Sequence, residues 1–459
     1  MMDTTSAAAA VQGRALGPAV TFTRVHSDTR TVAPGDLFVA LAGERFDGHD
    51  FVVEALARGA VAAMVRDDRV TPALAAAPLV AVPDTMAGLA ALATHWRGRF
   101  DLPVVAIAGS NGKTTTKEMV AAIFRAAVGA DAVAATAGNL NNAIGVPLTV
   151  LGLRARHRLA VFELGMNHRG ETRELARIVA PTIALVTNAQ REHQEFMRTV
   201  AEVAAEHADA VAALPRGGHA IVNADDAHAD VWRAAAQAAG ARVVTFGLAA
   251  AADVAATVVL AAEGSRLALA LPGGTHEVTL RVPGRHMAMN AVAAAAAALA
   301  AGVTAQAIVA GLGAFEPVAG RLVPRRGHAG GTVIDDTYNA NPDSVRAAID
   351  VLASLPGERW LVLGDMGEVG AAGPAFHREV GAYARSAGIA RLVCAGPLTR
   401  DSAAAFGAGA THFDSVEALV HALAGEDLRA AAVLVKGSRF MRMERVVQAL
   451  TGVAAKGGH

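Results

Sequence analysis

The sequence contains a single cysteine, Cys394, in 459 residues. One cysteine cannot form an internal disulfide, and no Cys-x-x-Cys or Cys/His spacing for a metal site occurs along the chain. The sequence therefore fits a reducing cytoplasm. Excess positive charge is also missing, because the formal net charge is −1. We expect no nucleic-acid partner and no anionic membrane partner, and any anionic ligand must be met by local positive groups.

Long hydrophobic runs are missing as well. The most apolar stretch, residues 291–303, has only 13 residues and is mostly alanine, which is too short and too weakly hydrophobic to span a bilayer. The N-terminus carries Asp3 and no basic stretch before the apolar residues 7–11, so it does not read as a secretory signal. We expect a protein without a membrane segment.

What is present is typical of a large, soluble globular protein. The chain is 53% hydrophobic and 18% charged, which excludes disorder, and 459 residues exceed what one core normally serves. Short apolar runs alternate with helical patterns, which predicts an α/β fold with parallel strands and crossover helices. We predict three domains, at residues 1–100, 101–316 and 317–459.

Each domain has its own expected elements. The first has a strand-like run at 37–41 and a helical pattern at 51–58. Strands of the central domain are expected at 104–108, 159–164, 183–187 and 220–222. The alternating segment 256–282, with its turn at Pro272, predicts an antiparallel hairpin added to that sheet, and a helix is expected at 291–299. Strands of the third domain are expected at 332–334, 360–363, 391–394 and 432–435.

A glycine-rich loop follows the first central strand. It consists of Gly109, Ser110, Asn111, Gly112, Lys113, Thr114 and Thr115. A strand before this loop and a helix after it predict a phosphate-binding loop, in which Lys113 neutralises the outer phosphates and Thr114 offers a hydroxyl to Mg²⁺. The strict G-x-x-x-x-G-K-[ST] pattern fails at Ile107, so an ordinary turn is the alternative. No guanine-selecting Asn-Lys-x-Asp occurs, which favours ATP.

Two further polar segments lie on the same predicted sheet. The loop Gly138 to Pro147 carries three asparagines, Asn139, Asn141 and Asn142, which is more than a turn requires, although turn formation is the alternative. Glu163 stands at the carboxyl end of the strand 159–164, where parallel sheets bind ligands. A solvated strand end is the simpler explanation, but combined with Thr114 the carboxylate becomes the preferred Mg²⁺ ligand.

These three segments, GSNGKTTTK, GNLNNAIGVPLT and FELGMNHRGE, closely resemble the Mur ligase family, the cytoplasmic ATP-dependent amide-forming enzymes of peptidoglycan synthesis. The resemblance covers the whole chain. SDTR from Ser27 and PGDLFVALAGERFDGHDF from Pro34 resemble the small α/β domain that holds a uridine nucleotide. DDTYNANPDS from Asp335, LGDMGEVG from Leu363 and KGSRFMRME from Lys436 resemble the Rossmann-like C-terminal ligase domain.

Within the family, GERFDGHDF, YNANPDS and LGDMGE resemble the member that adds D-alanyl-D-alanine to UDP-N-acetylmuramoyl-tripeptide. The Asp-Asn-Pro-Arg motif of the member that adds the third amino acid does not occur here. The resemblance implies that ATP phosphorylates the peptide carboxylate, that the incoming amine displaces the phosphate, and that the chain is a monomer. Lysine and diaminopimelate both remain open as the third residue of the tripeptide.

The resemblance also implies roles for individual residues. The catalytic residues would be Lys113, Glu163 and His193. Metal ligands would be Thr114, Glu163 and His193, although a polar loop residue is the alternative for this histidine. Nucleotide would be bound by Gly109 to Thr115, Asn290, Arg321 and Asp336, with interdomain ion pairing as the alternative for the last two. Substrate would be bound by Ser27, Arg30, Asn141, Asn142, Tyr338, Asn339 and Asn341.

Two positions depart from the family pattern. Met287 replaces an asparagine in GRHMAMNA. His207, in the expected helix 200–214, stands where many members carry a lysine modified to a carbamate that completes a second metal site. We therefore expect the second Mg²⁺ to be held differently, with His207, Glu206 and water as candidates.

Two other functions are alternatives to a Mur ligase. A folylpolyglutamate-type ligase would share the second and third domains but not a uridine-nucleotide domain, and residues 27–51 argue against it. A binding module that uses ATP only to change domain orientation would not need Glu163 beside the phosphates.

Overall fold

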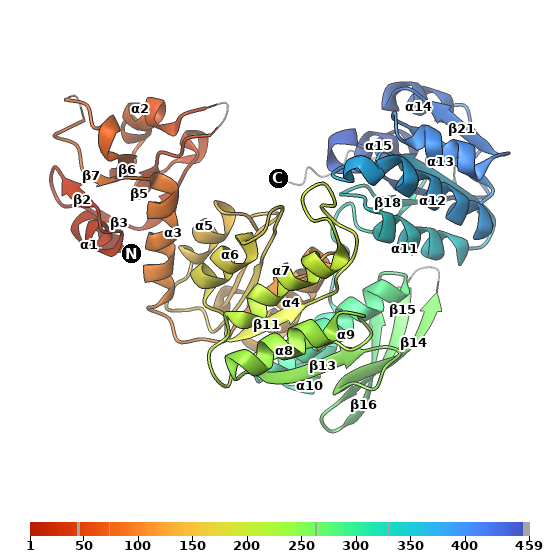
Figure 1. Cartoon of the computed structure of the whole chain (residues 1–459), viewed down its shortest axis with the longest axis horizontal. Helices are drawn as coiled ribbons and strands as arrows, with labels where there is room; N and C mark the ends of the chain where they lie inside the picture. The colour runs from red at the N-terminus through yellow and green to blue at the C-terminus, as the bar shows by residue number, and fades with distance from the viewer. Residues whose placement is uncertain (44–45, 73, 262–263, 329, 453–459) are drawn as a thin grey trace.

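The computed structural model describes residues 1–43, 46–72, 74–261, 264–328 and 330–452. Three large sheets follow one another along this part of the chain, and the first and third lie at opposite ends of the central one (Figure 1). Glu44 and Arg45 of the GERFDGHDF segment lie outside the described residues. None of the helices in these ranges combines the length and the apolar character that a bilayer crossing requires.

The first sheet has the strand order β2-β7-β6-β5-β4 and is parallel except for β2. Its strands are β2 (Arg14–Leu16), β4 (Arg24–His26), β5 (Asp36–Val39), β6 (Ala62–Arg66) and β7 (Leu79–Val82). A separate pair is formed by β1 (Met2–Asp3) and β3 (Thr21–Phe22). The helices are α1 (Thr4–Ala10), α2 (Val52–Ala57) and α3 (Thr85–Arg97). The expected strand at 37–41 and helix at 51–58 are thus present as β5 and α2.

Helix α3 attaches this first sheet to the central one. Its buried Trp96 donates from Nε1 to the carbonyl oxygen of Leu153 at 3.0 Å. The buried Arg97 donates from Nε to the carbonyl oxygen of Val179 at 2.8 Å, at the end of a central helix. Both groups lose water on burial, so these hydrogen bonds hold the end of α3 firmly on the central domain.

The central sheet has nine strands in the order β16-β15-β14-β13-β12-β11-β8-β10-β9. Its strands are β8 (Val104–Ala108), β9 (Val133–Ala135), β10 (Leu159–Glu163), β11 (Ile183–Val186), β12 (His219–Asn223), β13 (Arg242–Gly247), β14 (Val254–Ala261), β15 (Gly264–Leu271) and β16 (Gly274–Leu280). The four strands expected at the start of this domain are β8, β10, β11 and β12. They are mutually parallel and pair in the order β10-β8-β11-β12.

Helices cover both faces of this sheet. Buried side chains place α4 (Lys113–Val128), α9 (Arg285–Ala300) and α10 (Ala305–Gly313) on one face. The other face carries α5 (Gly145–Val150), α6 (Glu171–Val179), α7 (Val200–Ala212) and α8 (Ala229–Ala239). The strands β8, β10, β11 and β12 are buried on both sides, which explains why their sequences are continuous apolar runs.

The predicted hairpin and the alanine-rich helix are both present, and the helix extends beyond the residues expected from the sequence. β15 and β16 form the antiparallel hairpin, and β14 adds a third antiparallel strand that joins it to the parallel sheet through β13. Residues 291–300 of the apolar run at 291–303 lie in α9, whose alanines are buried between the sheet and α4. Small side chains allow this close packing, so the run is a core helix.

The third sheet has the order β17-β18-β22-β19-β20-β21 and is parallel except for β17. Its strands are β17 (Val323–Arg326), β18 (Thr332–Asp336), β19 (Glu358–Gly364), β20 (Arg391–Ala395), β21 (Ala410–Phe413) and β22 (Ala431–Lys436). One face carries α11 (Pro342–Ala353), α12 (Gly373–Ser386) and α13 (Thr399–Phe406), and the other carries α14 (Val416–Leu423) and α15 (Glu444–Thr451). The four expected strands are present, while the edge strands β17 and β21 were not predicted.

Candidate active site

The glycine-rich loop joins β8 to α4, as expected for a phosphate loop. Gly109 has φ +127° and Gly112 has φ +85°, both in the left-handed region that favours glycine. A Cβ atom on Gly109 would lie 2.0 Å from Thr187 Oγ1, and one on Gly112 would lie 2.4 Å from Asn290 Oδ1. The two glycines therefore let the loop pass close to β11 and α9, and α4 begins at Lys113 directly behind it.

Neighbouring side chains hold the loop backbone in place. Thr187 donates from Oγ1 to the carbonyl oxygen of Asn111 at 2.8 Å, and Asn188 Nδ2 donates to the same oxygen at 3.0 Å. Asn188 Oδ1 in turn accepts from the backbone N–H of Asn111 at 2.9 Å. The loop is thus pre-organised, and the N-terminus of α4 supplies the positive end of its dipole to an anion bound there.

The ammonium group of Lys113 folds back over its own loop. Nζ donates to the carbonyl oxygens of Gly109 and Ser110, the latter at 3.1 Å, and lies 3.4 Å from Glu192 Oε2. To hold a phosphate, the side chain must exchange these partners for phosphate oxygens.

The predicted metal ligands Thr114 and Glu163 meet behind the loop. Thr114 Oγ1 donates to Glu163 Oε1 at 3.1 Å, and Asn141 Nδ2 donates to the same oxygen at 2.8 Å. Glu163 Oε2 is buried without a hydrogen-bond partner among the described residues. An ionised oxygen without a partner fits a bound cation, and a carboxylate with a hydroxyl fits Mg²⁺.

These ligands do not form a complete metal site by themselves. In the described ranges, no three His, Cys, Asp or Glu side chains are grouped as a metal-binding cluster. Phosphate oxygens and water would have to complete the coordination, as is usual for Mg²⁺ at nucleotide sites.

The third domain contributes positive charge from the opposite side. Arg321 Nη2 donates to Thr114 Oγ1 at 3.0 Å, and its guanidinium group lies 4.1 Å from the ring centroid of Tyr338. Asn341 and Asn111 exchange amide hydrogen bonds, at 3.0 and 3.3 Å. Arg321 and Asn341 thus reach the phosphate loop across the domain interface, and Tyr338 packs against the Arg321 guanidinium group.

Asp336 and Asn339 are held by a buried lysine of β22. Lys436 Nζ donates to Asp336 Oδ2 at 2.7 Å and to the carbonyl oxygen of Asn339 at 2.8 Å. Lys436 is 3% exposed, so its charge is neutralised within the site. It was not among the predicted site residues, although it opens the KGSRFMRME motif.

These groups line one cavity of about 670 Å³ between the central and C-terminal domains. That volume is within the range of nucleotide and cofactor pockets. The predicted residues that line it are Ser110, Asn111, Gly112, Lys113, Thr114, Thr115, Asn141, Asn142, Glu163, His193, Asn290, Arg321, Asp336, Tyr338, Asn339 and Asn341. Buried Met287, which replaces the expected asparagine, also lines it, and Asn290 Nδ2 lies 4.0 Å from its sulfur.

Ser27 and Arg30 lie apart from this cavity. They follow β4 in the first domain, where the N–H of Ser27 donates to His26 Nδ1 at 3.0 Å and Arg30 Nη2 pairs with Asp28 Oδ2 at 2.6 Å. Their contact with a uridine nucleotide stays a prediction.

His193 lies where the central domain meets the LGDMGEVG loop. Its Nδ1 is 2.7 Å from Glu368 Oε2, and this neighbour lowers the pKa of Glu368. Its Nε2 is 3.8 Å from Glu192 Oε2. The residue has φ +48°, an unusual conformation for a non-glycine residue that the adjacent domain contacts hold in place.

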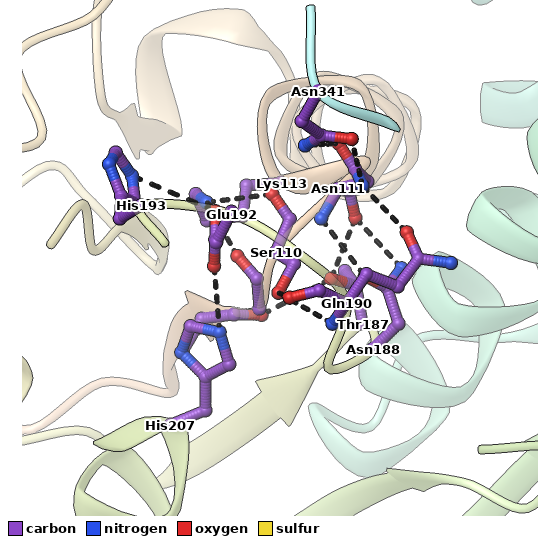
Figure 2. A network of polar contacts seen from close by, with 12 residues as sticks. Ser110, Asn111, Lys113, Thr187, Asn188, Gln190, Glu192, His193, His207 and Asn341 are labelled. Carbon is purple, nitrogen blue, oxygen red and sulfur yellow. Dashed lines mark hydrogen bonds and ion pairs between the residues drawn. The ribbon is translucent and has the colours of Figure 1, made fainter. Parts of the chain in front are cut away.

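Glu192 is a candidate that the sequence reasoning missed. It is 6% exposed and lies among Lys113, His193 and His207, with Oε1 3.1 Å from His207 Nε2 (Figure 2). Burial opposes its ionisation, but Lys113 and the two histidines outweigh this and lower the pKa of Glu192 to about 2. The only sequence signal was an acidic residue directly before His193.

Neither Glu206 nor His207, the two side-chain candidates for holding the second Mg²⁺, is among the residues that line the cavity. Both oxygens of Glu206 accept backbone N–H groups at the start of α6, from Gly170 and Thr172, each at 2.8 Å. His207 is 1% exposed and lies behind Glu192, which is the residue that lines the cavity.

Comparison with known proteins covers nearly the whole chain. Three family models match: Mur ligase family, catalytic domain, at residues 21–97; Mur ligase middle domain, at 107–298; and Mur ligase, glutamate ligase domain, at 320–439. The chain is 41% identical to the UDP-N-acetylmuramoyl-tripeptide–D-alanyl-D-alanine ligase of Escherichia coli over 96% of both chains.

Two solved structures are similar over the same extent. MurF from Acinetobacter baumannii has a TM-score of 0.89 and 32% identity, with 98% of this chain and 99% of that chain covered. The MurF ligase from Thermotoga maritima in complex with ADP has a TM-score of 0.81 and 26% identity, with 93% and 96% covered. The chain belongs to the Mur ligase family.

Proposed function

We propose that this chain joins D-alanyl-D-alanine to UDP-N-acetylmuramoyl-tripeptide, with ATP converted to ADP and phosphate. The printed activity of the Escherichia coli relative, 41% identical over 96% of both chains, supports this substrate pair. The observation that carries the proposal is the cavity in which Lys113, Glu163 and Arg321 converge from two domains. The contact of Arg321 with the Thr114 hydroxyl brings the third domain directly onto the nucleotide loop.

The reaction requires two anions to approach each other. A terminal carboxylate oxygen of the tripeptide forms a bond to the γ-phosphorus while the bond to the ADP oxygen breaks, which gives an acyl phosphate. The amine nitrogen of D-alanyl-D-alanine then attacks the acyl carbon, phosphate leaves, and the amine loses a proton. Lys113 and Arg321 supply the positive charge that these steps need, and Thr114 with Glu163 would hold a Mg²⁺ that neutralises phosphate charge.

Exclusion of water protects the acyl phosphate. The Asn111–Asn341 amide pair and the Arg321–Thr114 hydrogen bond close the phosphate loop from the side of the third domain. Enclosure also strengthens the electrostatic interactions inside the site. We therefore assign positioning and charge neutralisation to the protein, and no covalent nucleophile.

Phosphate release by the purified chain tests this function. We expect release only when ATP, UDP-N-acetylmuramoyl-tripeptide and D-alanyl-D-alanine are all present, with the lysine and diaminopimelate tripeptides compared side by side. Release with a free single amino acid in place of the dipeptide would redirect the assignment to another ligase of the family.

We further infer that the chain acts as a monomer in the cytoplasm. The phosphate loop, metal ligands and Arg321 of the cavity all come from one chain, so no second copy is needed to complete it. The requirement for ATP supports the location. Sedimentation at the enzyme concentration of the phosphate assay checks the oligomeric state.

A further inference from the structure

A buried carboxylate faces the phosphate loop without a role in the reaction described above. Glu192 lies after β11, and its Oε2 is 3.4 Å from Lys113 Nζ and 3.8 Å from His193 Nε2. Its Oε1 is 3.1 Å from His207 Nε2 (Figure 2). The two oxygens therefore point in different directions: Oε2 faces the cavity and Oε1 faces the protein interior.

His207 acts as a support behind this carboxylate. It projects from α7, is 1% exposed, and its Nδ1 has no hydrogen-bond partner among the described residues. The hydrogen bond to Glu192 places the ring proton on Nε2, and it orients the carboxylate towards Lys113 and His193. Carboxylates that bind metals are themselves commonly oriented by a hydrogen bond from a group behind them.

Binding of a triphosphate changes the surroundings of Glu192. Lys113 must turn its ammonium group to the phosphates, which takes away the nearest cation of Glu192. A buried carboxylate would then face an anionic ligand without a counter-ion, and both the burial and the like charge oppose this arrangement. A divalent cation between the carboxylate and the phosphates removes both penalties.

We propose that Glu192, oriented by His207, joins His193 in holding a second divalent cation against the triphosphate, beside the cation at Thr114 and Glu163. The inference rests on the proposed function only in requiring ATP at the phosphate loop. Glu192 is a ligand in this scheme, and His207 is a positioning residue.

Other side chains nearby are committed elsewhere. Glu206 caps α6, as described above. The lysines of the described residues other than Lys113 are engaged too, Lys117 with Glu118 and Lys436 with Asp336. No modified lysine is therefore needed at α7, because Glu192 brings a carboxylate to the cavity from a different element.

Counting bound Mn²⁺ tests the proposal without turnover. The intact chain is titrated with Mn²⁺ in the presence of β,γ-methylene ATP, and free Mn²⁺ is followed by its electron paramagnetic resonance signal. We expect two Mn²⁺ per wild-type chain. Glu192→Gln should weaken the second Mn²⁺ at least about tenfold, and His207→Ala should weaken it by about tenfold, within the range typical of residues behind a ligand.

Two variants separate orientation from simple damage. His207→Gln retains an N–H donor and should recover part of the loss seen in His207→Ala. Glu195→Gln, an exposed carboxylate three residues further along the same loop, is the matched control and should leave both Mn²⁺ affinities unchanged. Thermal melting checks that each variant is folded. If Glu192→Gln does not fold, Glu192→Asp replaces it, because the shorter side chain moves the carboxylate away from the cavity by one methylene group.

Two results would overturn the proposal: a single Mn²⁺ in the wild type, or two Mn²⁺ of unchanged affinity in Glu192→Gln. The titration contains no peptide substrate, so its outcome is independent of the ligase assay. A chain that shows the Glu192-dependent Mn²⁺ but releases no phosphate with D-alanyl-D-alanine would refute the proposed function and leave the second cation site standing.

Discussion

Arg191 connects the central domain to the C-terminal domain, and its replacement by alanine should loosen the closed site. Its guanidinium group contacts Asp343 at 2.6 Å and Glu379 at 2.7 Å, and it lies 5.3 Å from the ring centroid of Phe376. All three partners belong to the C-terminal domain, on α11 and α12. The three charged side chains are less than a third exposed, so solvent screens their attraction only in part.

The cost of this change can be estimated from the partners that remain. In Arg191→Ala, the backbone N–H of residue 191 still reaches Asp343 Oδ2, 2.8 Å away, and Glu379 keeps its bond from Arg346 Nη1 at 3.0 Å. Neither carboxylate is left without a hydrogen-bond donor. The interaction between the two domains should therefore lose about 2 kcal/mol of free energy, which is less than the cost of leaving a buried charge unpaired. That free energy is roughly a 30-fold change in an equilibrium constant.

Calorimetric titration with β,γ-methylene ATP measures the effect, because the cavity is formed by both domains. We expect Arg191→Ala to weaken nucleotide binding by up to about 30-fold, the full value of that 2 kcal/mol, and to enlarge the radius of gyration in solution scattering. Arg346→Ala is the matched control, since it removes an ion pair to the same Glu379 from within the C-terminal domain. Unchanged affinity and scattering in Arg191→Ala would show that Arg191 does not hold the domains together.

Three further predictions concern the site and its supports. Glu163→Gln should retain ADP binding but lose phosphate release, and full phosphate release would show that the reaction does not need the Glu163 carboxylate. Gly109→Ala, at φ +127°, should lower the free energy of unfolding by about 1–3 kcal/mol from backbone strain alone, measured in urea, and an unchanged midpoint would contradict this. Burial lowers the pKa of His377, whose neutral ring accepts from the N–H of Met366 at 3.0 Å and contacts the carbonyl oxygen of Gly373 at 2.7 Å. The contribution of His377 to stability is therefore complete above the unfolded pKa of about 6.5 and is lost as the pH falls below it. His377→Gln should make the free energy of unfolding less dependent on pH in this range. The same pH dependence in the wild type and the variant would refute the assignment.

Much of the fold could be predicted from the sequence because it depends on residues that are close together in the chain. The strands β8, β10, β11 and β12 are continuous apolar runs, since each is covered by helices on both faces. The phosphate loop depends on two glycines that adopt positive φ between a strand and a helix. This requirement is local, so it can be recognised in the sequence. Edge strands such as β17 were missed because one side of the strand is open and its VPRR sequence has little apolar pattern.

The α/β class, the phosphate loop and the pairing of Thr114, at the start of α4, with Glu163, at the end of β10, could thus be inferred from the sequence alone. Only the tertiary structure decided what surrounds Lys113. Glu192 and His207 are separated by 15 residues, and they meet because α7 packs its buried face beneath the loop after β11. The same packing sends Glu206 to cap α6. Adjacent residues of a helix point in different directions, so their partners depend on which face is buried, and that face is chosen by the whole domain.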